Sequence, residues 1–197
     1  MPRPPAASLV LASSSRYRQR LLAQLRIPYT TAAPNIDERP GGGEAPHELA
    51  LRLAGAKAQA VQAAFPEALI IGCDQVAVVD DTLLNKPGNH ANAVAQLRLM
   101  RGKPVSFFTA LCLLNARTAR TQSAVVTVIV HMRNLSDAQI ERYLKLEQPY
   151  DCAGSARIEG LGITLVEKLE GDDPNALIGL PLIKLCDMLR NENVELP

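Results

Sequence analysis

The chain has 197 residues, 47% of them hydrophobic, so it can bury a substantial core without disulfides or metals for stability. Its formal net charge of +1 gives no basic field that would concentrate a polyanion, and we expect no nucleic-acid partner. It has no apolar signal-peptide region before Ser13, no membrane-length apolar stretch, and no metal-site or redox spacing among its four cysteines. This composition predicts a cytoplasmic protein with reduced, buried cysteines and no membrane contact.

The first part of the chain alternates short strands with helices. The elements predicted in chain order are a buried strand (8–12), a helix (16–25), a strand (29–33), an irregular loop (34–43), a helix (46–64) and a strand (68–79). The serines of 13–15 can cap the first helix, and the prolines and glycines of the loop indicate a mobile lid. The long helix is amphipathic, with Lys57 beside its apolar face. The residues expected on that face are Leu49, Leu53, Ala56, Ala60 and Ala64.

The second part predicts a hairpin and two further helices. The elements are a helix (91–100), two β segments (105–114 and 121–132) joined through 115–120, a helix that starts at the capping-box-like Ser136 and ends near 146, a strand near 163–169, a turn (171–175) and a helix (181–190). We find no internal repeat and no flexible linker. One mixed α/β unit of two interlocked lobes fits this order best.

A carboxylate interrupts the strand over 68–79. The strand runs from apolar residues into Asp74 and Gln75 and then resumes. A carboxylate between isoleucine and valine loses hydration and is tolerated when it is paired, hydrogen-bonded or metal-bound. Further along, Lys86-Pro87 holds a cation in a turn, so an acid and a base can meet over one anionic substrate. This suggests phosphate chemistry, although Asp74 taken alone is equally well explained as a capped bulge or an edge position.

The turn over 13–15 is a second candidate for anion binding. It presents backbone N–H groups at a helix N-terminus, and Arg18, one turn later, can clamp phosphate oxygens. Simple N-capping beside a solvated arginine explains the same residues. Lys57 and the pair Asp37-Glu38, taken alone, are likewise typical of a solvated helix face and a solvated loop.

These motifs, in this order, resemble the Maf nucleotide pyrophosphatases over nearly the whole chain. The matching segments are 11–18, 37–38, 57, 71–75, 86–87, 143, 147–149, 153–155, 159–160 and 178–182. The resemblance implies a single Maf-like domain over 1–197. It also implies the α/β fold of the inosine triphosphate pyrophosphatase-like proteins, which is an elongated, twisted mixed sheet flanked by helices, with two lobes around a central cleft.

Three segments resemble one subgroup of that family. Asp74-Gln75, with 152–155 and 173–175, is similar to the subgroup that hydrolyses 7-methyl-GTP, whereas the subgroup acting on dTTP and UTP has threonine after the aspartate. The resemblance implies a hydrolase of phosphoric anhydride bonds that converts 7-methyl-GTP to its monophosphate and pyrophosphate, a house-cleaning role. Two alternatives stay open: a dTTP/UTP pyrophosphatase, and a non-catalytic nucleotide-binding regulator of cell division.

The resemblance also implies a catalytic group. Asp74 is expected to be the general base toward water, or a ligand of the divalent cation (Mg²⁺ or Mn²⁺) that activates the water, with Glu38 as a second metal ligand. Lys57 and Lys86 are expected to neutralise charge on the departing pyrophosphate. Lys86 is the stronger candidate of the two, because the following proline holds it in an extended turn.

The remaining candidates bind the substrate. The residues expected to hold the triphosphate are Ser13, Ser15 and Arg18, and those expected to select the base are Tyr17, Gln75 and Glu159. The 7-methylguanine base carries a delocalised positive charge, which favours stacking on an aromatic ring, and a carboxylate can accept from its N1–H and amino group. A half-buried tyrosine and an exposed acid explain Tyr17 and Glu159 equally well without the resemblance.

The chain departs from the family pattern beside these residues. Arg16 stands where proline is usual, and Asn85 stands where glycine usually precedes Lys-Pro, so both phosphate-side turns are expected to be reshaped. Tyr17 replaces a tryptophan that is frequent in the subgroup, which weakens stacking modestly. Besides the nucleoside triphosphate, the expected partner is a second copy of the chain, because the apolar strand over 125–130 makes a homodimer reasonable.

Overall fold

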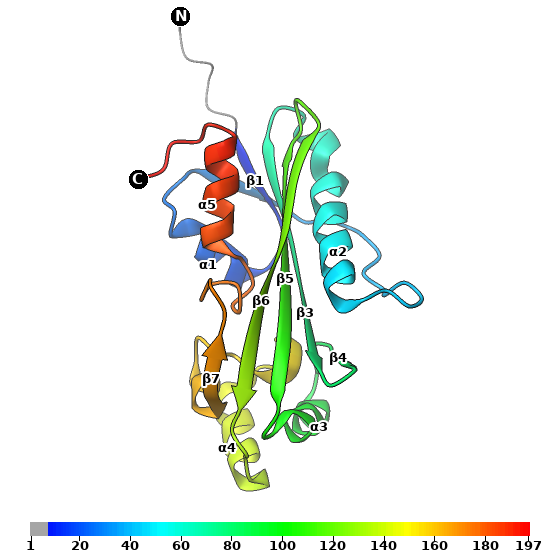
Figure 1. Ribbon diagram of the computed structural model, residues 1–197, viewed down its shortest axis with the longest axis vertical. Coiled ribbons are helices and arrows are strands. Elements are labelled where there is room, and N and C mark those ends of the chain that lie inside the picture. Colours follow the sequence, from blue (N-terminus) through cyan, green and yellow to red (C-terminus); the bar gives the residue numbers. More distant parts are fainter. Residues whose placement is uncertain (1–7) are drawn as a thin grey trace, which may run out of the picture.

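A computed structural model describes residues 8–197 as one elongated molecule (Figure 1). The strands within that range are β1 (Leu9–Ala12), β2 (Tyr29–Ala32), β3 (Leu69–Val79), β4 (Thr82–Leu84), β5 (Pro104–Asn115), β6 (Arg120–Met132) and β7 (Val166–Glu170). The helices are α1 (Arg16–Ala23), α2 (Pro46–Val61), α3 (His90–Met100), α4 (Asp137–Glu147) and α5 (Leu182–Asn191). Residues 1–7 lie outside the described residues. They begin the segment in which we expected no signal peptide.

The seven strands of the described range form one open, mixed sheet. Its order is β2-β1-β3-β5-β6-β7, and β4 pairs with the end of β3. β1 runs parallel to β2 and β3, whereas the pairs β3–β5, β5–β6 and β6–β7 are antiparallel. The long strands β3, β5 and β6 run along most of the molecule and connect its two ends (Figure 1). The predicted mixed α/β fold is confirmed.

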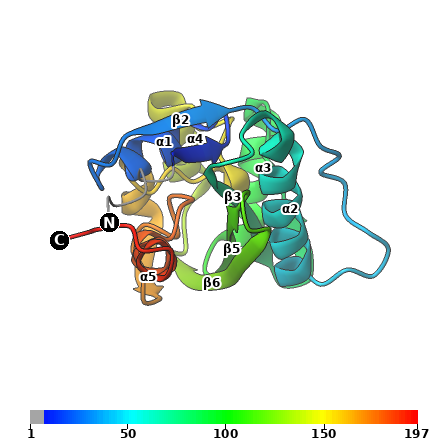
Figure 2. The same cartoon turned by 90° about the horizontal axis from the view of Figure 1, so that it is seen from above.

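Helices cover both faces of the upper half of the sheet. α2 lies on one face, and α1 and α5 lie on the other (Figures 1 and 2). Each side has its own apolar cluster, the first built on α2 and the second on α1 and α5. A third cluster fills the lower end, where α3 and α4 pack beside the ends of the long strands. The molecule therefore has two lobes that share one sheet.

The apolar face of α2 differs from the predicted one. The buried residues of this helix are Leu49, Ala50, Leu53, Ala54, Lys57, Ala58 and Val61. Ala60 and Ala64 are exposed and Ala56 is half-buried, so the prediction for these three alanines was wrong. Because alanines occur around the whole helix, the spacing of the leucines is compatible with two neighbouring buried faces. The face that is buried in the structure includes Lys57.

Most local predictions hold, with two differences. The Ser15 hydroxyl accepts the N–H of Arg18 at the start of α1, and a capping box of Ser136 and Gln139 starts α4. The predicted hairpin is the β5–β6 pair. The last strand begins at Val166 rather than near 163, because Leu161–Leu165 forms a 3₁₀ helix, and the short strand β4 was not predicted.

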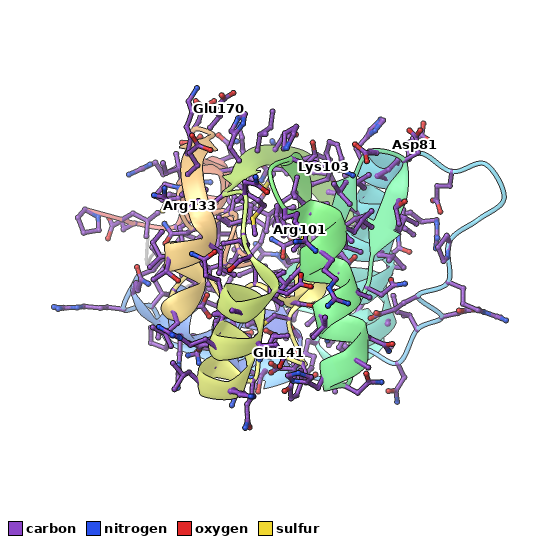
Figure 3. The ribbon with its side chains drawn as sticks, turned by 90° about the horizontal axis from the view of Figure 1, so that it is seen from below. Asp81, Arg101, Lys103, Arg133, Glu141 and Glu170 are labelled. Carbon is purple, nitrogen blue, oxygen red and sulfur yellow. The ribbon has the colours of Figure 1, made fainter. Side chains whose placement is uncertain are left out.

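Charges of both signs are interspersed at the lower end of the molecule. Figure 3 shows Arg101, Lys103 and Arg133 there together with acidic side chains. Arg101 pairs with Asp137 at 2.9 Å, and Lys103 pairs with Asp80 at the same distance.

No α-helix in the described range has the length and apolar character needed to cross a bilayer.

Candidate active site

A cleft of about 720 Å³ lies where the two lobes meet. Its walls come from the turn before α1, the middle of β3, the turn after β4, and the segments around 151–159 and 177–179. All the residues proposed from the sequence line it: Ser13, Ser15, Tyr17, Arg18, Glu38, Lys57, Asp74, Gln75, Lys86 and Glu159. Residues from most of the chain length therefore face one volume, large enough for a nucleotide.

A buried lysine joins two carboxylates at the centre of the cleft. The Lys57 ammonium lies 2.5 Å from the nearer oxygen of Asp74 and 2.8 Å from that of Glu38. Only 6% of Lys57 and 8% of Asp74 are exposed. Lys57 is therefore not a solvated lysine, and Asp74 does not lie in a bulge, because β3 pairs with β5 residue by residue at this position. Each buried charge has its partner.

Gly72 allows α2 to approach closely enough for this contact. A Cβ atom at Gly72 would lie 2.0 Å from the carbonyl oxygen of Ala54 and 2.8 Å from the nitrogen of Ala58, both in the α2 backbone. Side chains alternate along a strand, so Gly72 and Asp74 share the face that α2 covers. The absence of a side chain two residues before Asp74 thus brings the helix that carries Lys57 onto the carboxylate.

The charge of Glu38 is favoured by the cations around it. Partial burial raises its pKa, but the hydrogen bond and charge of Lys57, with the charges of Lys86 and Arg18, lower the pKa below its ordinary value overall. These three cations come from different elements. Glu38, Lys57 and Asp74 form a triad, and Arg18 and Lys86 line the same cleft. Lys86 itself is exposed, and the residue that contacts Asp74 is Lys57, the weaker candidate from the sequence.

The phosphate-side turn is built from local hydrogen bonds. The backbone N–H of Ser15 donates to the Ser13 hydroxyl at 3.1 Å, and the Ser15 hydroxyl caps α1. Arg18 reaches across the cleft wall, where its Nε donates to the carbonyl oxygen of Gly179 at 2.9 Å. Arg18 is therefore oriented by the protein, and its guanidinium has a fixed place at the start of a helix, where the helix dipole favours anions.

Gln75 is held by protein groups. Its side-chain amide donates to the Thr109 hydroxyl at 2.9 Å and to the carbonyl oxygens of Ala176 and Leu177 at 2.9 and 3.1 Å. Thr109 lies opposite Gln75 in the β3–β5 register and also donates to Ala176. Gln75 lines the cleft, but its amide N–H groups fasten the segment around 176–177 to the sheet.

A second group of cleft residues surrounds Tyr17. The phenol lies 3.3 Å from the Asp151 carboxylate, and the guanidinium carbons of Arg16 and Arg157 lie 5.1 and 5.7 Å from the ring centroid. Burial raises the pKa of Tyr17, so this hydroxyl stays protonated at neutral pH. Glu159 accepts from Arg157 Nε at 3.2 Å. The aromatic face and the carboxylate expected to select the base are thus neighbours.

Sequence reasoning missed Asp151, Arg157 and the role of Glu147. Asp151 pairs with Arg16, and Arg157 pairs with both Glu147 and Glu159. The only signal in the sequence is that Arg157 and Glu159 are two residues apart, and in the structure they belong to one turn, which the N–H of Gly160 closes on the carbonyl oxygen of Arg157. The contact with Glu147 depends on how this segment folds back on α4.

The donor set suits a hard divalent cation. Glu38 and Asp74 already direct carboxylate oxygens at a single point, the Lys57 ammonium. Within the described residues, no group of three or more His, Cys, Asp or Glu side chains is placed to hold a metal. Two converging carboxylates fit Mg²⁺ or Mn²⁺, which bind few protein ligands and take their other oxygens from substrate phosphates and water.

Comparisons with known proteins cover nearly the whole described range. The sequence profile of a family described as "Maf-like protein" matches residues 8–192. Several curated proteins named 7-methyl-GTP pyrophosphatase are similar to the chain. The protein from Methylobacillus flagellatus is 59% identical over 95% of this chain and 97% of its own length. Those from Cupriavidus metallidurans and Albidiferax ferrireducens are 56% and 52% identical and also match over more than nine-tenths of both chains.

Proposed function

This chain belongs to the Maf family, and we propose that it hydrolyses 7-methyl-GTP to the monophosphate and pyrophosphate. The observation that carries the proposal is the Glu38–Lys57–Asp74 triad in a cleft that Arg18, Lys86, Tyr17 and Glu159 also line. A nucleoside triphosphate that lies along the cleft brings its phosphates to the triad and its base to Tyr17.

The reaction is attack of water on the α-phosphorus. Asp74 accepts the proton of the water, the new P–O bond forms, and the bond from the α-phosphorus to the bridging oxygen breaks, so that pyrophosphate departs with that oxygen. Lys57 exchanges a carboxylate contact for phosphate oxygens, which frees Asp74 to act as the base. Arg18 and Lys86 hold the phosphates and offset the charge that accumulates on the leaving group.

Charge balance explains why Maf-family pyrophosphatases generally depend on a divalent metal. The three cations Arg18, Lys57 and Lys86 face the two carboxylates Glu38 and Asp74, so these side chains carry a net charge of only +1. A bound triphosphate is far more negative. Asp74 and Glu38 would hold Mg²⁺ or Mn²⁺, which would supply the missing positive charge and lower the pKa of bound water.

Base selection follows from the chemistry of the other end. A planar cation such as 7-methylguanine stacks on the Tyr17 ring more favourably than a neutral base does. Glu159 lines the same end and can accept hydrogen bonds from the N1–H and amino groups of a guanine. A pyrimidine offers a smaller stacking surface and no such donor pair.

The experiment compares wild type with Asp74→Asn in Mg²⁺ or Mn²⁺, using 7-methyl-GTP, GTP, dTTP, UTP and CTP, with monophosphate and pyrophosphate as products. We expect wild type to prefer 7-methyl-GTP and the variant to bind nucleotide but lose most turnover, by about 10²-fold or more. Asp187→Asn, on the exposed side of α5, is the matched control. Full activity in Asp74→Asn would refute the mechanism.

The same panel decides between this function and its alternatives. A preference for dTTP and UTP would make the chain a pyrimidine-nucleotide pyrophosphatase. Tight binding without turnover of any nucleotide would indicate a regulatory protein, such as one acting in cell division. We place the activity in the cytoplasm as a house-cleaning reaction and propose that the chain forms a homodimer, which light scattering at several protein concentrations tests.

A further inference from the structure

Arg157 lies behind the wall of the cleft at its base-binding end. Ala156, Ile158 and Glu159 line the cleft, whereas Arg157 does not. Its side chain is 30% exposed and lies between two carboxylates, with Nη1 2.9 Å from Glu147 Oε1 and Nε 3.2 Å from Glu159 Oε1. Arg157 therefore contacts a group that faces the substrate without facing the substrate itself.

Glu147, at the end of α4, gives this arginine a rigid support. Its side chain is 9% exposed, and its second oxygen accepts the backbone N–H of Leu161 at 2.8 Å. A Cβ atom at Gly160 would lie 2.7 Å from Glu147 Oε1, so in this position the carboxylate packs directly against the glycine. Glu147 thus ties both the Arg157 guanidinium and the following backbone to the helix.

The backbone of Arg157 is fixed as well. Its N–H donates to the Tyr143 hydroxyl at 2.9 Å, and its carbonyl oxygen accepts the N–H groups of Gly160 and Gly162 at 3.1 and 3.0 Å. With the chain held on both sides and the guanidinium anchored at Glu147, the end of Arg157 has little freedom. A second donor of the same guanidinium, the Nε–H, donates to Glu159 Oε1.

The same guanidinium also lies 5.7 Å from the centroid of the Tyr17 ring. One planar group therefore contacts both proposed elements of base recognition, the aromatic face and the carboxylate. A glutamate without such a partner samples several rotamers, so holding Glu159 in one of them favours binding of a base that needs this acceptor. Two carboxylates and one guanidinium leave this unit with a net charge of −1, which suits a cationic base.

We propose that Arg157, supported by Glu147, is a positioning residue that sets guanine recognition by orienting Glu159 against Tyr17. This inference rests on the proposed function, because it assigns Glu159 to the donor edge of the base. It predicts a unit that acts on base binding and leaves the phosphate side of the cleft untouched, since neither Arg157 nor Glu147 contacts the triad residues.

The test compares Arg157→Gln, Arg157→Lys and the control Arg142→Gln, an exposed arginine on α4. For Arg157→Gln we expect the KM for 7-methyl-GTP to rise about tenfold, which is the change in affinity that the loss of one hydrogen bond to a charged group produces. We expect kcat to change less than about threefold. Arg157→Lys keeps the charge and should recover part of the loss. Inorganic tripolyphosphate, which has no base, should inhibit all variants with the same Ki.

Two results would overturn the proposal. One is an unchanged KM in Arg157→Gln, and the other is an equal loss in kcat and in tripolyphosphate inhibition, which marks a general structural defect. Thermal melts identify such a defect directly. Absence of turnover in wild type would refute the proposed function alone, because calorimetric binding of 7-methyl-GTP to wild type and Arg157→Gln still measures whether Arg157 sets base affinity.

Discussion

Replacing Gly72 with alanine tests whether the close approach of α2 to β3 builds the proposed catalytic triad. The new Cβ would lie 2.0 Å from a backbone oxygen of α2, and an ordinary contact needs at least 3.4 Å. The helix must therefore retreat by roughly 1.4 Å, the difference between these two distances. The obstacle is backbone, so no side-chain rotation can relieve it, and the Lys57–Asp74 contact on the same face must lengthen.

The expected cost follows from overpacking of a buried contact. Such substitutions destabilise by about 1–3 kcal/mol, and a backbone clash belongs at the upper end of that range. For a chain of this size, about 3 kcal/mol lowers Tm by roughly 6–12 °C. A displacement of about 1 Å in a catalytic group can reduce turnover about 10²-fold, so we expect activity to fall further than stability alone explains.

The assay pairs calorimetric Tm with steady-state turnover of 7-methyl-GTP at a temperature where both proteins are folded. Gly55→Ala is the matched control, because a Cβ there meets nothing within 4 Å and alanine favours the helix interior by about 0.5–1 kcal/mol. Gly55→Ala should melt at or above the wild-type temperature with normal activity. A Gly72→Ala protein with wild-type Tm and turnover would show that this glycine does not set the position of Lys57.

Two further substitutions test charged pairs outside the triad. Arg52→Gln should raise the pKa of Glu44 from about 2 toward its ordinary value of about 4.3, because the hydrogen bonds from Arg52 and the Gly41 backbone lower it; NMR titration of the Glu44 carboxyl measures this. Because the pKa of Glu44 is depressed in the folded state, the ion pair stabilises the protein above the ordinary pKa, and this stabilisation is lost as the pH falls toward 2. A Glu44 pKa that stays at about 2 in the variant contradicts the assignment. Arg16→Pro removes an exposed ion pair to Asp151 and introduces a residue suited to the first helical position. We therefore expect Tm to change by at most about 3 °C. A larger fall in a thermal melt would show that this ion pair holds the lobes together.

The order of elements could be predicted because each follows from a local signal. The apolar run that ends at Asp74, the capping serines and the turn residues act over a few neighbouring positions, and the strands and helices form where these signals predict. β4 escaped prediction because it has three residues, too few for a periodic pattern. The strand expected near 163 starts later, because glycine-rich local turns compete with strand pairing there.

The candidate residues could be named from the sequence, but their relative importance could not. Lys57 ranked below Lys86, because a lysine on an alanine-rich helix is usually solvated. Burial of Lys57 depends on which of two equivalent stripes faces the sheet, and that choice is made by the contact between Gly72 and the helix backbone. A tertiary contact between backbones has no signature in hydrophobic periodicity.

The C-terminal third of the chain gives the clearest case of a role that only the fold creates. The carbonyl oxygen of Gly179 accepts from Arg18 Nε and from the thiol of Cys73, and the carbonyls of 176–177 accept from Gln75. Cys73 and Gln75 flank Asp74 on β3, so the segment over 176–179 is fastened to the strand on both sides of the Asp74 carboxylate and to Arg18 on α1. The acceptors are backbone carbonyls more than a hundred residues from the β3 donors, so no pattern in the sequence indicates these hydrogen bonds. It follows that a change at Gln75 acts on Arg18 and on the shape of the cleft, so its effect on base preference passes through this segment.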